Sequence, residues 1–359
     1  MKENIKIIKI LGIETSCDDT GVAIISTKYD SNNGNKIISK TIHERLSSQI
    51  SVHSKYGGVV PELASREHLK SLLPLTKEVF IEAGISATDI DAIGITTGPG
   101  LSGALLTGTS FACGLSEATN CPLIPVNHLE GHILSVLLEN DNLNSQCTFP
   151  FLALLISGGH TQIIEVDGVG LYKILGQTID DAVGEAFDKT ALLLGLGYPG
   201  GPEISRVGLK GNKLKFKFPK PLCNKDTLNF SFSGLKTAVL TETKKNDIKN
   251  SKIKRDLASS LEFTISEILT TKCKLALKKT GLKRLALSGG VASNRLIRES
   301  FITLSKDLDI DVYFPTKRLC TDNGTMIAWA ATQKYLSGFT PIKTENIEIL
   351  PRWSLKNTS

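Results

Sequence analysis

Apolar and polar residues alternate along the first half of the chain in a way that predicts short strands separated by helices. The apolar runs are four to ten residues long and end at turn-forming residues, which is typical of strands. Pro61 opens a longer amphipathic pattern, and proline is favoured in the first turn of a helix. We expect strands at 5–14, 21–26, 37–45, 92–98 and 122–126, and a long helix at 61–83.

The same order of elements begins again in the second half of the chain. The segment 151–166 predicts a strand, a glycine turn and a second strand, like the hairpin at the start of the sequence. We expect helices at 180–196 and 252–279, strands at 284–290 and 311–315, a helix entered at Val291, and a last helix capped by Thr321. This repetition predicts an α/β protein with two similar lobes. We expect a first lobe at 5–127, completed by a C-terminal helix at about 321–350, and a second lobe at 128–320.

Composition narrows the class of protein. The chain has 359 residues, of which 41% are hydrophobic, enough for about two domains with packed cores. No apolar run approaches the ~20 residues that span a bilayer, and the N-terminus lacks the apolar block of a signal peptide. The seven cysteines show no CxxC spacing, which favours free thiols in a reducing compartment. We therefore expect a cytoplasmic protein, whose net charge of +6 permits a polyanionic partner.

The segment NHLEGHI places two histidines four residues apart at the predicted start of a helix. His128 and His132 then lie on one helical face, where they can hold one metal ion. A zinc protease needs its glutamate directly after the first histidine, whereas Glu130 comes second and points to another side of the helix. Asp322, before the last helix, is a candidate third ligand, and such a set suits iron(II), zinc or manganese. Two surface histidines on a capped helix, with Asp322 as an ordinary N-cap, are the alternative.

Three glycine turns follow predicted strands. Ser157–Gly159 and Ser288–Gly290 are both SGG, and Pro99–Gly103 is PGLSG. Glycine lets backbone amides approach a ligand, so the three turns together favour a nucleotide-sized site, although plain hairpins use glycine too. Neither a phosphate-binding P-loop nor a Rossmann fingerprint is present in the sequence. The helix that begins near Asp180 carries several acids beside apolar residues, and we expect those acids to line a site.

Two lysine-rich stretches are candidates for contact with nucleic acid, and a solvated lysine face is the alternative for each. The first holds Lys210, Lys213, Lys215, Lys217 and Lys220, and the second holds Lys244, Lys245, Lys249, Lys252, Lys254 and Arg255.

Ten motifs lie in one order across nearly the whole chain: GIETSCDDTGVAI, GGVVPELASREH, TTGPGLSGAL, NHLEGHI, LLISGGHTQI, DDAVGEAFDK, YPGGPEI, FSFSGLKTA, SGGVASN and TDNGTMIA. By these motifs the sequence resembles the bacterial TsaD family of tRNA N6-adenosine threonylcarbamoyltransferases, once called O-sialoglycoprotein endopeptidases. The resemblance implies a two-lobed actin/Hsp70/sugar-kinase-like (ASKHA) fold with a central nucleotide cleft. It implies transfer of the threonylcarbamoyl group from threonylcarbamoyl-adenylate to the N6 amine of the adenosine beside the anticodon, in tRNAs that read ANN codons.

The resemblance also implies roles for individual residues. The metal, Fe²⁺ or Zn²⁺, is expected on His128, His132 and Asp322. Asp18 matches a position needed for activity, and we expect it to accept the proton of the amine; its neighbour Asp19 stands where many members have glutamate. The adenylate pocket is expected at Leu155, Ile156, Ser157, Gly158, Gly159, Asp188, Gly201 and Asn294.

The expected partners are tRNA, a paralogous metal-free protein (TsaB-like) and a small ATPase (TsaE-like), and no membrane. Two other classes of function remain as alternatives. A metalloprotease is disfavoured by the position of Glu130. A sugar kinase or a non-catalytic nucleotide-binding scaffold would need neither tRNA nor the histidine pair.

Overall fold

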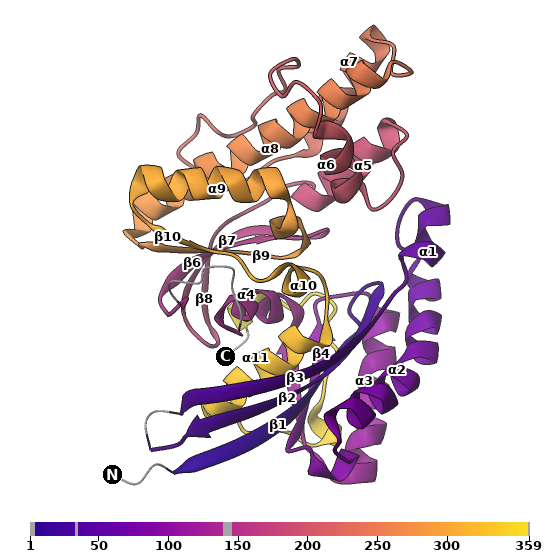
Figure 1. Ribbon diagram of the computed structural model, residues 1–359, viewed down its shortest axis with the longest axis vertical. Coiled ribbons are helices and arrows are strands. Elements are labelled where there is room, and N and C mark those ends of the chain that lie inside the picture. The colour runs from indigo at the N-terminus through magenta and orange to yellow at the C-terminus, as the bar shows by residue number, and fades with distance from the viewer. Residues whose placement is uncertain (1–3, 33–34, 139–145, 358–359) are drawn as a thin grey trace. The chain divides into compact units, whose positions relative to one another are not determined.

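The computed structural model of the chain describes residues 4–32, 35–138 and 146–357 (Figure 1). It divides into two compact units, of which unit 1 is Met1–Leu138 with Thr321–Ser359 and unit 2 is Glu139–Cys320. The division therefore falls after the helix that starts at His128, whereas the sequence placed it before that helix. The reason is packing, since this helix lies against the C-terminal helix of unit 1.

Unit 1 is built on a five-stranded mixed sheet in the order β3-β2-β1-β4-β5. Its strands are β1 (Ile5–Glu14), β2 (Asp19–Asp30), β3 (Lys36–Ser48), β4 (Ala92–Gly98) and β5 (Leu123–Asn127). The first three form an antiparallel meander, and β4 and β5 continue parallel to β1. Every residue of β4 is buried, as expected for a parallel strand covered on both faces.

Helices cover both faces of this sheet. Helices α2 (Pro61–Ala83) and α3 (Ser102–Thr119) pack on one face, and α11 (Gly324–Leu336) packs on the other against β1 and β2 (Figure 1). Helix α4 (His128–Leu138) follows β5 without a connecting loop and packs on α11. The short helix α1 (Ile50–His53) precedes α2.

Unit 2 repeats the sheet order of unit 1. Its strands are β6 (Phe151–Ile156), β7 (Thr161–Gly168), β8 (Leu171–Gln177), β9 (Arg284–Ser288) and β10 (Asp311–Tyr313). They lie in the order β8-β7-β6-β9-β10, again with an antiparallel meander followed by two parallel strands. The repetition expected from the sequence is therefore present in the topology.

The helices of unit 2 surround a second core. They are α5 (Val183–Leu193), α6 (Gly200–Gly208), α7 (Ser233–Lys245), α8 (Ser251–Thr280), α9 (Arg295–Leu308) and the short α10 (Lys317–Cys320). A 3-10 turn occupies Gly290–Ser293, where the sequence predicted the start of a helix. Within the described residues, no helix is long and apolar enough to cross a membrane.

Candidate functional site

Three potential metal ligands come together inside unit 1. His128 is the first residue of α4, and His132 follows one turn later on the same helix. Asp322 lies two residues before α11, and its neighbour Asn323 caps that helix by accepting a hydrogen bond from Met326 N at 2.7 Å. The sequence predicted Thr321 as the cap, which is wrong. Because Asn323 does the capping, the Asp322 carboxylate can face the histidines.

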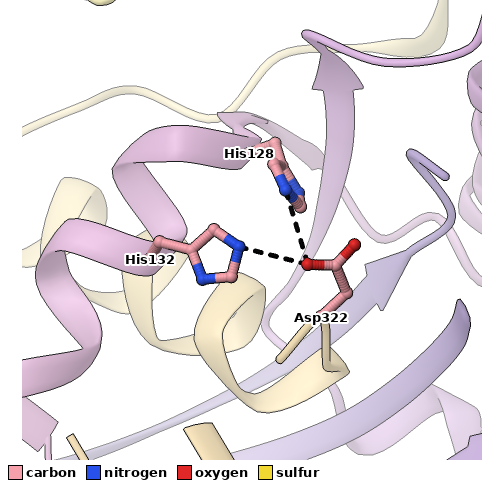
Figure 2. A group of neighbouring side chains, drawn as sticks. All are labelled: His128, His132 and Asp322. Carbon is pink, nitrogen blue, oxygen red and sulfur yellow. Dashed lines mark hydrogen bonds and ion pairs between the residues drawn. The ribbon is translucent and has the colours of Figure 1, made fainter. Parts of the chain in front are cut away.

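The geometry of the three side chains fits one divalent metal ion. Both imidazoles face the Asp322 carboxylate in Figure 2, with Oδ1 lying 3.1 Å from His132 Nε2 and 3.6 Å from His128 Nε2. All three ligand atoms lie within 4.8 Å of one another, and both histidines are buried. Ligands that share a metal at about 2.1 Å lie roughly 3.0–3.4 Å apart, so the His132–Asp322 distance is already suitable and the His128–Asp322 distance is slightly longer. Two imidazoles and a carboxylate leave coordination positions open for a substrate.

Glu14 stands behind His128 at the end of β1. Its Oε2 lies 3.1 Å from His128 Nδ1, and it also accepts hydrogen bonds from Thr96 Oγ1 and the amide of Ser16. Burial would raise the pKa of Glu14, but the nearby His128 more than offsets this and the pKa is lowered. An ionised carboxylate on Nδ1 leaves Nε2 of His128 for a metal, the usual arrangement around metal-binding histidines.

Protonation of His128 in the metal-free protein follows from the same carboxylates. Burial disfavours the imidazolium, but Asp322 and Glu14 outweigh it and raise the pKa of His128 to about 9. A metal ion that binds His128 would therefore take the place of a proton.

Glu130 does not belong to this group. It is buried on α4, and its carboxylate interacts electrostatically with Lys334 of α11. Lys334 Nζ also donates to the carbonyl of Pro125 at 2.9 Å. The carboxylate is thus engaged away from the group of three, as its position in NHLEGHI indicates.

The turn between β1 and β2 carries Asp18 and is held from the side of α2. His68 Nε2 donates to the carbonyl of Cys17 at 2.9 Å, and His68 Nδ1 accepts from Thr20 Oγ1 at 2.8 Å. Burial lowers the pKa of His68, so the ring is neutral and keeps one donor and one acceptor. His68 thus holds the backbone of Cys17 and the side chain of Thr20, on either side of Asp18.

Burial also changes the chemistry of the turn itself. It raises the pKa of the Asp18 carboxyl, and it raises that of Asp19 to about 7, with Asp322 adding to the effect. Burial likewise raises the pKa of the Cys17 thiol, which therefore stays protonated and is a poor nucleophile.

In unit 2, both SGG turns lie at the same edge of the sheet. Ser157–Gly159 follows β6, and Ser288–Gly290 follows β9, the parallel neighbour of β6. Gly289 has φ of 87°, and a Cβ there would lie 2.5 Å from the carbonyl oxygen of Ile156, so the second turn rests on the end of β6, directly before the first turn. Gly158 and Gly159 are exposed, with open space where a Cβ would stand. The carboxyl ends of neighbouring parallel strands are where α/β proteins bind nucleotides.

The other predicted pocket residues have partners within unit 2. Asp188 of α5 accepts a hydrogen bond from Gly200 N at 2.6 Å, which places it beside Gly201 at the start of α6. Leu155 and Ile156 are buried in β6. Asn294 is the N-cap of α9, accepting from Ile297 N, and its side-chain amide donates to Glu262 Oε1 at 2.7 Å. The Asn294 side chain thus serves the fold.

Two expectations about these segments differ from the structure. The PGLSG turn lies in unit 1, and its amides at Gly100 and Leu101 donate to Pro351 and Ser16, so they are already satisfied. The acids of α5 and the preceding residues are also largely used in the fold. Asp181 and Glu185 pair with Lys189 at 2.8 and 2.9 Å, and Asp180 accepts hydrogen bonds from Ser231, Phe232 and Ser233.

Glu14 and His68 are not among the site residues predicted from the sequence. They lie inside two of the ten motifs, GIETSCDDTGVAI and GGVVPELASREH, but neither their spacing nor their charge indicates a role in the site. A carboxylate at the end of an apolar strand that enters a polar turn is the one available signal for Glu14.

Comparison with known proteins decides the family. A family model described as tRNA N6-adenosine threonylcarbamoyltransferase, TsaD, matches residues 40–329. The chain belongs to this family. A relative of that name from Bordetella petrii is 47% identical over 351 residues, covering 96% of this chain and 97% of the relative. One from Acidovorax sp. is 49% identical over 347 residues, with 96% and 97% covered.

Solved structures share the fold at low sequence identity. Full-length HypF, in a phosphate- and nucleotide-bound form, matches 94% of this chain with a TM-score of 0.56 and 15% identity, and this chain spans 48% of it. Component A of (R)-2-hydroxyglutaryl-CoA dehydratase from Acidaminococcus fermentans matches 92% of this chain and 99% of its own, with a TM-score of 0.51 and 15% identity. With the two repeated α/β units, these likenesses confirm the expected ASKHA-like fold class.

The family membership also confirms the recognition made from the ten motifs. The predicted class of enzyme, a transferase that modifies tRNA, is confirmed with it.

Proposed function

We propose that this protein transfers the threonylcarbamoyl group from threonylcarbamoyl-adenylate to the N6 amine of the adenosine beside the anticodon of tRNA. We further propose that its substrates are tRNAs reading ANN codons, that the reaction requires a divalent metal, and that it takes place in the cytoplasm. Family membership supports the type of reaction. The observation that carries the metal requirement is the convergence of two buried imidazoles and one carboxylate within 4.8 Å.

His128, His132 and Asp322 would hold the metal, with Fe²⁺ as our first choice and Zn²⁺ as our second. When bound, the ion supplies Lewis-acid stabilisation of negative charge on a phosphate-bearing donor. Glu14 would fix the ring of His128 so that Nε2 faces the ion. This role would explain why the chain keeps the Glu14 carboxylate fully buried beside His128.

The paired SGG turns of unit 2 would bind the adenylate. Gly158 and Gly159 are exposed at the turn after β6, where their amides can donate to an anionic oxygen. Asp188 and Gly201, joined through Gly200, would contact the nucleoside. Positioning of donor and acceptor then supplies much of the rate without a covalent intermediate.

Asp18 is our proposed acceptor for the amine proton. It lies on a turn whose backbone is fixed by His68, and burial raises its pKa from the ordinary value of a carboxyl. A raised pKa makes a carboxylate a stronger base at neutral pH. The buried Cys17 thiol beside it has no role in this scheme.

We propose two protein partners, a paralogous metal-free protein (TsaB-like) and a small ATPase (TsaE-like). The support for both partners is the family to which the chain belongs.

The test is a transfer assay with synthesised threonylcarbamoyl-adenylate, an ANN-decoding tRNA transcript and both partner proteins. Wild type would be compared with His132→Ala and with His43→Ala, a histidine on β3 outside the group of three. Bound metal would be quantified in each preparation by mass spectrometry.

We expect product from wild type and His43→Ala, with loss of both metal and product in His132→Ala. Product from a metal-free His132→Ala protein would reduce the ion to a structural role. Absence of product from metal-loaded wild type with active partners would contradict the proposed reaction.

A further inference from the structure

The positive charge of the chain is concentrated in one segment of unit 2. Residues 210–255 contain thirteen Lys and Arg against three Asp and Glu, a net charge of +10. The whole chain carries +6, so the remaining residues together carry −4. The basic character of the protein is therefore local.

Contacts within unit 2 bring the two lysine-rich stretches together. The loop 209–220 lies along the first turns of α8, where Asp256 Oδ1 accepts from Asn212 N at 2.7 Å. One turn further along the helix, Ser260 Oγ accepts from Phe216 N at 3.2 Å. The second stretch is the end of α7, the connection to α8 and the first turn of α8 itself. Both stretches thus meet where α8 begins.

Gly211 allows the loop 209–220 to pack closely against α8. A Cβ at Gly211 would lie 2.1 Å from the carbonyl oxygen of Arg255, so the loop backbone rests directly on the helix backbone. The lysines on either side of Gly211 are thereby held near the lysines of α8 by backbone packing rather than by their own side chains.

Most lysines at this place lack an acidic partner. Lys220 pairs with Glu267 and Lys245 with Glu242, but no other salt bridge within the described residues involves the lysines of the two stretches. We call the others the basic surface: Lys210, Lys213, Lys215, Lys217, Lys244, Lys249, Lys252 and Lys254. All of them are exposed except Lys254, which is half-buried.

The helix dipole does not favour the lysines at the start of α8. The first turn of α8 contains no acidic residue, yet Lys252 and Lys254 stand there, at the positive end of the helix dipole. Like charges on the docked loop add to the repulsion. A polyanion bound across the surface would relieve both.

The chemistry of the surface fits phosphates better than bases. Phe216 is half-buried and stacks on the buried Phe218 with ring centroids 6.4 Å apart, so neither ring offers an open platform for a base. Contacts from lysine to phosphate position a nucleic acid and depend strongly on salt.

We propose that the basic surface binds the phosphate backbone of the substrate tRNA. The inference rests on the proposed function, which supplies the tRNA, and it adds where this chain holds that partner. It predicts that binding is largely independent of tRNA sequence and is weakened by salt.

The experiment measures the affinity of the full chain for a fluorescently labelled ANN-decoding tRNA transcript by anisotropy, at 50, 100 and 200 mM salt. The test variant carries Lys215→Gln, Lys217→Gln and Lys252→Gln. The matched control carries Lys274→Gln, Lys278→Gln and Lys283→Gln, an equal change of charge at and just beyond the other end of α8.

We expect the test variant to bind about tenfold more weakly at 100 mM salt, with the slope of log Kd against log salt reduced by roughly 2 to 3. The control should stay within twofold of wild type. In the transfer assay, KM for tRNA should rise while kcat stays unchanged. The melting temperature of the test variant should be no lower than that of wild type, because the three lysines that it lacks repel the neighbouring lysines in the folded protein.

Wild-type affinity and salt slope in the test variant would overturn the inference, and so would an equal loss in the control. Those results leave the proposed function standing as long as wild type modifies tRNA. If wild type neither binds nor modifies tRNA, the proposed function itself fails.

Discussion

Glu14 lies behind His128, one of the three candidate metal ligands. Its carboxylate is fully buried and lies 3.1 Å from His128 Nδ1, so it selects the ring orientation that presents Nε2. Partners of this kind tune metal affinity although they never touch the ion.

Replacing Glu14 by glutamine tests that role. The amide keeps the volume but loses the charge that holds a proton on Nδ1 of His128. We expect Zn²⁺ affinity, measured by competition with a chromophoric chelator, to fall about 10- to 100-fold. Glu130→Gln is the matched control, because Glu130 lies between the two histidines in sequence but outside the group of three, and it should keep wild-type affinity. Unchanged affinity in Glu14→Gln would show that packing and the Ser16 hydroxyl, 3.0 Å from His128 Nδ1, orient the ring without the Glu14 charge.

Asp19 gives a prediction about pH. Burial, with help from Asp322, raises its pKa to about 7, and its Oδ1 has no hydrogen-bond partner within the described residues. In the unfolded chain the carboxyl has an ordinary pKa near 3.9. Between about pH 4 and 7 the folded protein thus keeps a proton that the unfolded chain releases. Its stability should therefore fall as pH rises through this window.

Asp19→Asn removes that titration. In chelator-treated protein, we expect the Tm gained by the substitution to be roughly 3–6 °C larger at pH 8 than at pH 5. Asp167→Asn, at an exposed aspartate of β7, serves as the control and should show no such difference. An equal gain at both pH values would mean that Asp19 is ionised throughout.

At the scale of elements, α11 packs closely on the sheet of unit 1 because glycines stand at the points of contact. A Cβ at Gly12 of β1 would lie 2.3 Å from Ala328 N, and one at Gly21 of β2 would lie 2.4 Å from Gly324 N. The helix backbone thus rests on the strands. Because Asp322 is two residues before this helix, the glycine contacts also determine where that ligand stands.

Gly12→Ala should therefore disturb both packing and ligand. We expect a loss of about 1–3 kcal/mol in the free energy of unfolding, measured with urea, and weaker Zn²⁺ binding. Gly114→Ala on α3 is the control, since a Cβ there meets nothing within 4 Å. It should be neutral or stabilise by up to about 1 kcal/mol, because alanine is the better helix former. Equal stability of both variants would show that α11 can move away from the sheet.

Some elements could be predicted from the sequence and others could not. The bounds of β1, α2 and β4 agree with the expected ones, because apolar runs end there at proline, glycine or polar turns. By contrast, β8 has a single buried residue and α7 has a weak apolar face, so packing in three dimensions stabilises both and their local pattern is faint. Helix α6 has a clear apolar face, but it opens with Gly-Gly-Pro, which hides its start in the sequence.

Some features of the candidate site could likewise be predicted from the sequence, and others could not. The four-residue spacing of His128 and His132 was sufficient to pair them, since helical geometry is local. The separation of PGLSG from the two SGG turns was not visible, and neither was the contact between Glu14 and His128. Both depend on which strands become neighbours, and the sequence carries no local mark of that.

At the scale of the molecule, the candidate metal ligands and the two SGG turns lie in different units. Each unit has its own sheet and core, and the chain passes between them at 138/139 and 320/321. All three ligands belong to unit 1. Both tryptophans of the chain, Trp329 and Trp353, belong to unit 1 as well. Tryptophan fluorescence therefore reports the unfolding of one unit, whereas calorimetry reports both.

This leads to a prediction for metal removal and return. In chelator-treated protein, we expect calorimetry to resolve two transitions, one of which coincides with the change in tryptophan fluorescence. Zn²⁺ at 100 times its Kd should stabilise that unit by about 2.7 kcal/mol, a shift of roughly 5–10 °C, because the ion binds only the folded ligand set. The other transition should stay in place.

Two controls decide how the shift is interpreted. His132→Ala should abolish it, because one of the three ligands is gone, whereas His43→Ala on β3 should preserve it. A shift of the transition that tryptophan does not report would place the ion in unit 2. A single transition seen equally by both methods would mean that the two cores unfold together, and the ion would then shift that one transition.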